Sequence, residues 1–167
     1  IQAVVLPIAA HKTGVTEKSA EVVSMLQKAG LRVRFDDRDN VSPGWKFNEW
    51  ELKGVPVRIE VGPRDIENGV VTLVRRDTFQ KTTAPLNETL LENVCNLLDD
   101  IQKKMYDIAF SFQQQHTVDV FDMDSLKNQV NGGYARTMWC GSRECEDRIR
   151  EETGATSRNM PFDQEKY

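Results

Sequence analysis

The feature that most constrains the fold is the alternation of short apolar runs with amphipathic runs in the first half of the chain. Residues 3–8 are apolar and rich in β-branched side chains, as expected for a strand buried on both faces. The next apolar residues recur at the spacing of one helix face: Val22, Val23, Leu26 and Ala29. This order of elements predicts an α/β fold with crossover helices.

The same patterns predict the other elements of this half. We expect a helix over 16–29 that Gly30 ends, and a strand over 31–35. Ser42 followed by Pro43 is typical of a helix start, here running to residue 54. Further strands are expected over 55–61 and 70–74, with a turn between them.

A long helix is expected to open at residues 83–85 and to run to about residue 115, because apolar residues recur there at a period near 3.5. Beyond it we expect a short polar helix near Ser125, a break at Gly132 and a strand over 134–139. A charged helix to about residue 153 and a strand-like end over 157–162 complete the pattern. These limits give a first domain at 1–116 and a small α/β domain at 117–167.

Composition excludes several classes of protein. No apolar run approaches the roughly 20 residues of a membrane span, so we expect no membrane contact. Three cysteines argue against a secreted disulfide scaffold, which favours the cytoplasm. The chain begins with Ile1 and not Met, so we expect a fragment or a processed product. Its net charge of −4 disfavours indiscriminate binding of nucleic acid.

The charge is unevenly distributed. Residues 1–83 hold 13 Lys and Arg against 11 Asp and Glu, whereas residues 84–167 hold 9 against 15. An anionic partner is therefore expected to bind the first half. The sequence also lacks the P-loop, the dinucleotide-binding glycine motif, the HExxH zinc motif and the GxSxG nucleophile motif. We expect this chain to carry out no chemistry by itself.

The densest cluster of unusual residues lies at 42–65. Phe47 and Glu51 are four residues apart on the expected helix and share a face, and Arg58 and Arg64 flank the following strand. An aromatic plane, a carboxylate and arginines together suit an unpaired RNA segment. The alternative is structural: Phe47 and Trp50 belong to the core, and Glu51 and Arg58 form an ion pair.

Cys140 and Cys145 are spaced as two of the four ligands of a structural zinc site. Cys95 lies within the long helix pattern, and His11 and His116 are distant in sequence, so no second pair of ligands is evident. The alternative is a pair of small thiols without metal.

At 42–65 the sequence SPGWKFNEWELKGVPVRIEVGPRD resembles the anticodon-binding domain of prolyl-tRNA synthetases, a member of the class II anticodon-binding group. The flanking runs VVLPIA, VRFDDRDN and VVTLVRRDT support the resemblance. The later run MWCGSRECEDRIREETGATSRNMPF resembles the extra carboxyl-terminal domain of the archaeal and eukaryote-like branch. The resemblance implies a mixed sheet flanked by helices, followed by a small α/β domain of the zinc type.

The resemblance also implies roles for five residues in reading the two guanines of proline anticodons. Phe47 would stack on a base, and Glu51 would accept hydrogen bonds from a guanine edge, whose N1–H and N2–H are donors. Arg58 would contact a base or its backbone, Arg64 a base, and Lys81 a phosphate or a base.

The parent enzyme implied by the resemblance is a dimeric synthetase that uses ATP and Mg²⁺ to form prolyl-adenylate and then prolyl-tRNA. Its catalytic domain is missing from this sequence, so we expect the fragment alone to be inactive. In metal-binding members a second cysteine pair follows the Pro-Phe segment, but no cysteine follows Phe162 here. Cys140 and Cys145 are therefore expected to bind Zn²⁺ only if such a pair exists.

Two other functions stay open. The chain could be a stand-alone α/β regulatory or ligand-binding domain that has lost RNA binding. It could also be a structural module whose small domain only braces a catalytic partner.

Overall fold

The computed structural model describes residues 1–160 and residue 162. The chain divides into two compact units, Ile1–Tyr106 and Asp107–Tyr167, and the division lies within one long helix. The predicted domain limits at residues 116 and 117 stay a prediction. No helix among the described residues is both long and apolar enough to pass through a bilayer.

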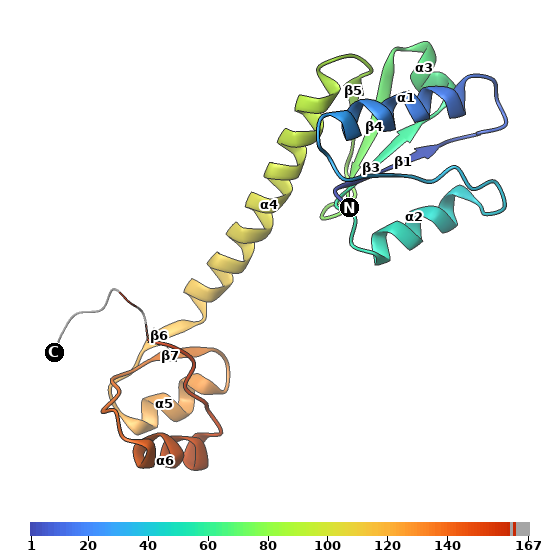
Figure 1. Ribbon diagram of the computed structural model, residues 1–167. Helices are drawn as coiled ribbons and strands as arrows, with labels where there is room; N and C mark the ends of the chain where they lie inside the picture. Colours follow the sequence, from blue (N-terminus) through green and yellow to red (C-terminus); the bar gives the residue numbers. More distant parts are fainter. Residues whose placement is uncertain (161, 163–167) are drawn as a thin grey trace. The chain divides into compact units, whose positions relative to one another are not determined.

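The first unit is built on a five-stranded mixed sheet (Figure 1). The strand order is β2-β1-β3-β4-β5, in which β1 is parallel to both β2 and β3 while β4 is antiparallel to β3 and to β5. The strands are β1 (Ala3–Pro7), β2 (Val33–Phe35), β3 (Val57–Val61), β4 (Val70–Arg75) and β5 (Lys81–Pro85). The predicted mixed sheet with flanking helices is confirmed.

Four helices accompany this sheet: α1 (Val15–Lys28), α2 (Pro43–Leu52), α3 (Pro63–Glu67) and α4 (Leu90–Gln115). The predicted start of α2 is confirmed, since the Ser42 hydroxyl accepts a hydrogen bond from the Trp45 backbone N–H at 3.3 Å and Pro43 occupies the first turn. Figure 1 shows α1 and α2 on opposite sides of the sheet.

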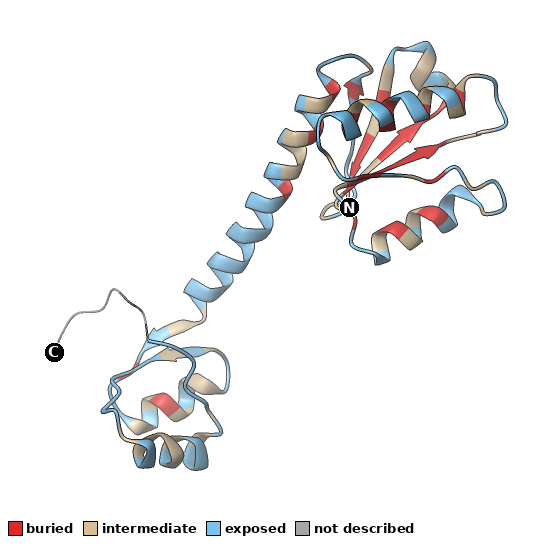
Figure 2. Ribbon diagram, viewed as in Figure 1, coloured by how far each residue is buried: buried red, intermediate tan, exposed pale blue. Residues whose placement is uncertain are grey.

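The two faces of the sheet carry separate apolar clusters, and the strands between them are the most buried part of the unit (Figure 2). Val57, Ile59 and Val61 of β3 pack in the larger cluster with residues of α1 and α4. Successive residues of a strand point to opposite faces, so Arg58 and Glu60 lie on the face that α2 covers. The period of the strand thus directs both charged residues toward α2.

Two elements differ from the sequence prediction. Lys81–Pro85 forms β5 beside β4, although residues 83–85 were expected to open the long helix, which begins instead at Leu90. The proline that suggested a helix start ends a strand, and the pairing with β4 explains why. Residues of the expected turn after β3 form the short helix α3.

The second unit contains β6 (Thr117–Asp119), α5 (Met123–Val130), β7 (Tyr134–Arg136) and α6 (Arg143–Thr153). β6 and β7 pair in parallel. The strand expected over 134–139 is shorter than predicted. Residues 154–160 form neither helix nor strand, and residue 161 of the expected terminal strand lies outside the described residues.

Candidate nucleic-acid interface

The structure brings four of the five predicted RNA-contacting residues together on the α2 face of the sheet. Phe47 and Glu51 lie one turn apart on α2, and both contact Arg58 of β3. The guanidinium carbon of Arg58 lies 4.0 Å from the centroid of the Phe47 ring, a cation–π distance. Its Nη1 donates a hydrogen bond of 2.6 Å to Glu51 Oε1. The helical spacing of Phe47 and Glu51 therefore aims both at one strand residue.

Lys81 joins this cluster through a residue that the sequence prediction missed. Glu60 Oε1 accepts a hydrogen bond of 3.0 Å from Arg58 Nε, and Glu60 Oε2 lies 3.1 Å from Lys81 Nζ. Lys81 reaches Glu60 from β5, two strands away in the sheet. The sequence feature that could have indicated Glu60 is a carboxylate two positions after Arg58 in a strand that is otherwise largely apolar.

Arg64 lies apart from this cluster. It is exposed on α3, and its side chain makes no hydrogen bond, ion pair or ring contact among residues 1–160. The neighbouring Asp65 fixes the turn: it accepts hydrogen bonds from the Gly62 N–H at 2.8 Å and from the Thr72 hydroxyl at 3.2 Å. The turn is thus ordered while the Arg64 guanidinium remains available to a ligand.

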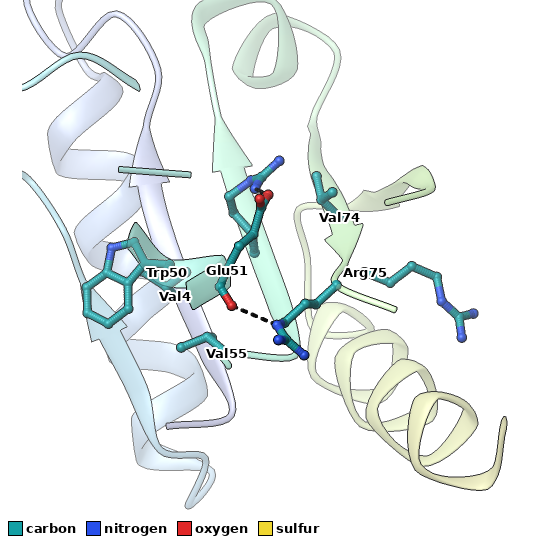
Figure 3. Close-up of a pocket in the computed structure, with 8 residues that line it drawn as sticks. Val4, Trp50, Glu51, Val55, Val74 and Arg75 are labelled. Atoms are coloured by element: carbon teal, nitrogen blue, oxygen red, sulfur yellow. Dashed lines mark hydrogen bonds and ion pairs between the residues drawn. The ribbon is translucent and has the colours of Figure 1, made fainter. Parts of the chain in front are cut away.

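A small pocket adjoins the cluster, and Figure 3 shows Glu51 among the side chains that line it. The backbone carbonyl of Glu51 accepts a hydrogen bond of 2.8 Å from Arg76 Nε. Arg76 was not predicted as a site residue. The other lining residues are Val4, Trp50, Val55, Arg58, Val74 and Arg75.

A second polar cluster holds α2 against the sheet. Asp36 is buried directly after β2 and accepts hydrogen bonds from Trp50 Nε1 at 2.7 Å and from Arg38 Nε at 2.8 Å. The ammonium of Lys46, also buried, lies 3.2 Å from the Asp36 carbonyl oxygen. Burial by itself raises the pKa of Asp36, but the hydrogen bonds from Arg38 and Trp50 and the charge of Lys46 outweigh it and lower the pKa to about 2.

The structural alternative to RNA binding accounts for part of this geometry. Trp50 is buried, Phe47 is half-buried, and Glu51 is paired with Arg58. The Glu51 side chain nevertheless keeps 28% of its surface exposed, and that of Lys81 keeps 57%. The ion pair therefore lies where a ligand can reach it.

The two cysteines of the second unit lie close enough for their thiols to interact. The pKa of Cys140 is lowered by the Ser142 backbone N–H and by the Cys145 thiol, while that of Cys145 is raised because its thiol donates to Cys140. Among the described residues no three His, Cys, Asp or Glu side chains are grouped to hold a metal ion. Two thiols do not fit a structural zinc site, which needs four ligands.

Two sequence families match the chain. The family described as anticodon binding domain matches residues 2–93, and the family described as prolyl-tRNA synthetase, C-terminal, matches residues 123–167. The first match includes all five predicted anticodon-binding residues, and the second includes Cys140 and Cys145.

Curated relatives match nearly the whole chain. Proline–tRNA ligase 2 of Clostridioides difficile (strain 630) is 47% identical over 167 residues, which are 99% of this chain and 34% of that protein. Proline–tRNA ligase of Alkaliphilus oremlandii (strain OhILAs) is 47% identical over 166 residues, 98% of this chain and 34% of the relative. Proline–tRNA ligase of Oceanobacillus iheyensis is 46% identical over 166 residues, which are 99% of this chain and 34% of that protein.

The chain thus spans about a third of the length of the curated relatives it matches. More than half of its own residues lie in the first family match, on the unit that carries the mixed sheet and the Phe47–Arg58 cluster. The fold class expected from the resemblance, the anticodon-binding domain of class II synthetases, is confirmed. The chain belongs to the anticodon binding domain family.

Proposed function

We propose that the chain is the anticodon-recognition and carboxyl-terminal region of a prolyl-tRNA synthetase, an enzyme that ligates proline to tRNA(Pro) through prolyl-adenylate. The observation that carries this proposal is the joint contact of Phe47 and Glu51 with Arg58 on a partly exposed face. The identity of 47% with proline–tRNA ligases over nearly the whole chain supports it.

In this proposal Glu51 recognises guanine. Its Oε1 is bonded to Arg58, and no hydrogen bond among the described residues involves its Oε2. The free Oε2 can accept from one of the adjacent N1–H and N2–H donors of guanine, and Oε1 can accept from the other once it leaves Arg58; adenine, which presents an acceptor at N1, does not suit a carboxylate. Phe47 supplies the stacking surface and Arg58 the positive charge beside it.

Arg64 and Lys81 bind further groups of the anticodon loop. Arg64 contacts a base from α3, and Lys81 contacts a phosphate or a base from the edge strand β5. Both are exposed, as contacts to RNA require. The anticodon-binding part extends over residues 1–116 and the small domain over residues 117–167.

The rest of the enzyme supplies the catalysis. In this proposal the catalytic domain, which uses ATP and Mg²⁺, corresponds to part of the two thirds of the relatives that this chain does not span. We place the enzyme in the archaeal and eukaryote-like branch, as a cytoplasmic homodimer. The match of residues 123–167 to the family described as prolyl-tRNA synthetase, C-terminal, supports the assignment of the small domain to such an enzyme. Nothing in the proposal requires zinc.

The test is a titration of the chain with proline tRNA and with the same RNA carrying two replaced anticodon guanines, at one fixed low salt concentration. We expect a preference of at least about tenfold, or about 1.4 kcal/mol, which Glu51→Ala abolishes. The matched control is Glu21→Ala, which removes a glutamate from the opposite face, on α1.

Equal binding of both RNAs, or of neither, would contradict the proposal and favour the regulatory domain that has lost RNA binding. The bracing alternative predicts that Glu51→Ala and Arg58→Ala leave RNA affinity unchanged. It also predicts that deletion after Val118 lowers the activity of the whole enzyme.

A further inference from the structure

Glu60 is a nearly buried carboxylate with two cationic partners and no role in the proposed contacts. Only 10% of its side chain is exposed. Its Oε1 accepts a hydrogen bond from Arg58 Nε at 3.0 Å, and its two oxygens lie 3.3 and 3.1 Å from Lys81 Nζ. A buried charge costs free energy unless it is paired, so these contacts explain how the charge is tolerated but not what it does.

The position of Arg58 suggests an answer. Its guanidinium stacks over Phe47 and is bonded by different nitrogens to two carboxylates, Nη1 to Glu51 and Nε to Glu60. The Arg58 side chain is only 11% exposed. If Glu51 were its only partner, a ligand that drew Glu51 away would leave a buried guanidinium unpaired, which is costly.

In the proposed function, guanine is such a ligand, because it draws Glu51 away from Arg58. The two N–H donors of the base compete with Arg58 Nη1 for the same carboxylate. With Glu60 in place, Arg58 keeps one charge-assisted hydrogen bond and its position over Phe47 while Glu51 turns toward the base. The second carboxylate therefore lowers the cost of guanine recognition without touching the RNA.

We infer that Glu60 is a specificity-determining positioning residue that anchors Arg58 over Phe47, so that Glu51 can exchange its contact with Arg58 for the edge of a guanine. This inference rests on the proposed function and adds to it a residue that contacts no base. Lys81 has the secondary part of balancing the charge of Glu60 from β5.

Anchoring of Arg58 by Glu60 and simple repulsion between the Glu60 charge and RNA predict different results. Removal of an anion close to bound RNA strengthens binding of every RNA through reduced repulsion, and the ratio of two affinities stays constant. Loss of the Arg58 anchor instead lowers the affinity for the guanine-containing RNA more than for the substituted one. The ratio of the two affinities is thus the decisive quantity.

The experiment compares the 167-residue chain with Glu60→Gln and with Glu67→Gln, a matched control on α3 that removes an exposed charge and has no contact with Arg58. We expect Glu60→Gln to lower the guanine preference at least about fivefold and Glu67→Gln to leave it unchanged. Glu60→Asp, which keeps the charge but has a shorter reach, should give an intermediate preference and serves if Glu60→Gln does not fold.

A double-mutant cycle tests whether Glu60 acts through Arg58. In an Arg58→Lys background, which removes the forked donor, Glu60→Gln should cause no further loss of preference. Lys81→Met should lower the affinity for both RNAs and keep their ratio.

The outcomes distinguish the inference from the proposed function. If the unaltered chain shows no guanine preference, the proposed function fails and the inference with it. If the unaltered chain shows a preference that Glu60→Gln leaves intact, the inference alone is overturned. The same holds if Glu60→Gln lowers the preference by the same factor in the Arg58→Lys background as in the unaltered chain.

Discussion

The indole nitrogen of Trp50 donates a hydrogen bond of 2.7 Å to the Asp36 carboxylate, which joins the last turn of α2 to the segment directly after β2. The same carboxylate binds Arg38, which also binds Glu49 of α2. These contacts fix the orientation of α2 and therefore the direction in which Phe47 and Glu51 point. The orientation of the candidate RNA-binding face thus depends on a buried charge in the segment directly after β2.

The first prediction concerns the stability that Asp36 provides. Asp36→Asn should lower the free energy of unfolding by about 3 kcal/mol at neutral pH, because it removes the anion beside the buried Lys46 and one of the two carboxylates that pair with the partly exposed Arg38. Chemical denaturation followed by Trp fluorescence measures this. Asp37→Asn, an exposed neighbour, should change the free energy by less than about 0.5 kcal/mol.

The second prediction concerns how the Asp36 carboxylate makes the free energy of unfolding depend on pH in acid. The pKa of Asp36 in the folded chain, about 2, lies below its ordinary value of 3.8. Its contribution to stability is therefore complete above about pH 4 and is lost as the pH falls through about 2. Asp36→Asn should remove this part of the acid branch of the stability curve. An unchanged acid branch would show that Asp36 is not ionised as its contacts imply.

The third prediction concerns the order of thiol reactivity. Cys140 is exposed and its pKa is lowered, whereas the pKa of Cys145 is raised. Since the thiolate is the nucleophile, iodoacetamide at neutral pH should label Cys140 before Cys145, as peptide mass spectrometry would show. Cys145→Ala removes the thiol donor and should slow the labelling of Cys140. Faster labelling of Cys145 would contradict the arrangement.

The fourth prediction concerns packing in the second unit. A Cβ at Gly133 would lie 2.3 Å from the His116 carbonyl oxygen, which accepts the hydrogen bond of the Tyr134 N–H at 2.7 Å. Gly133→Ala should destabilise the unit by about 1–3 kcal/mol and accelerate amide exchange at Tyr134. Gly132→Ala is the matched control, because a Cβ there has no atom within 4 Å. Equal rates of amide exchange at Tyr134 in the two variants would contradict the close contact between Gly133 and the His116 carbonyl oxygen.

The fifth prediction separates binding from folding at Arg64. Its exposed side chain makes no hydrogen bond, ion pair or ring contact within residues 1–160, so Arg64→Ala should leave the melting temperature unchanged. The affinity for proline tRNA should fall about tenfold, within the range for one arginine contact to a base. Arg32→Ala, another exposed arginine before β2, should bind as the unaltered chain does. Equal affinities of all three proteins would exclude Arg64 from the interface.

The sequence by itself was sufficient wherever one local period decides the structure. The predicted helix over 16–29 corresponds to α1 (Val15–Lys28), and the predicted start of α2 at Ser42 and Pro43 is confirmed. The shared face of Phe47 and Glu51 followed from a spacing of four residues on a helix. These features depend on side chains that are neighbours along the chain, and the sequence displays them directly.

Only the tertiary structure decided which distant residues meet those neighbours. Glu60 meets Lys81 because β4 pairs with both β3 and β5, and β5 itself forms only through that pairing. Asp36 meets Trp50 because α2 packs across the face that β1 and β3 share. Strand register and helix packing are set by the summed burial of many apolar side chains, so no short segment encodes which charges they bring together.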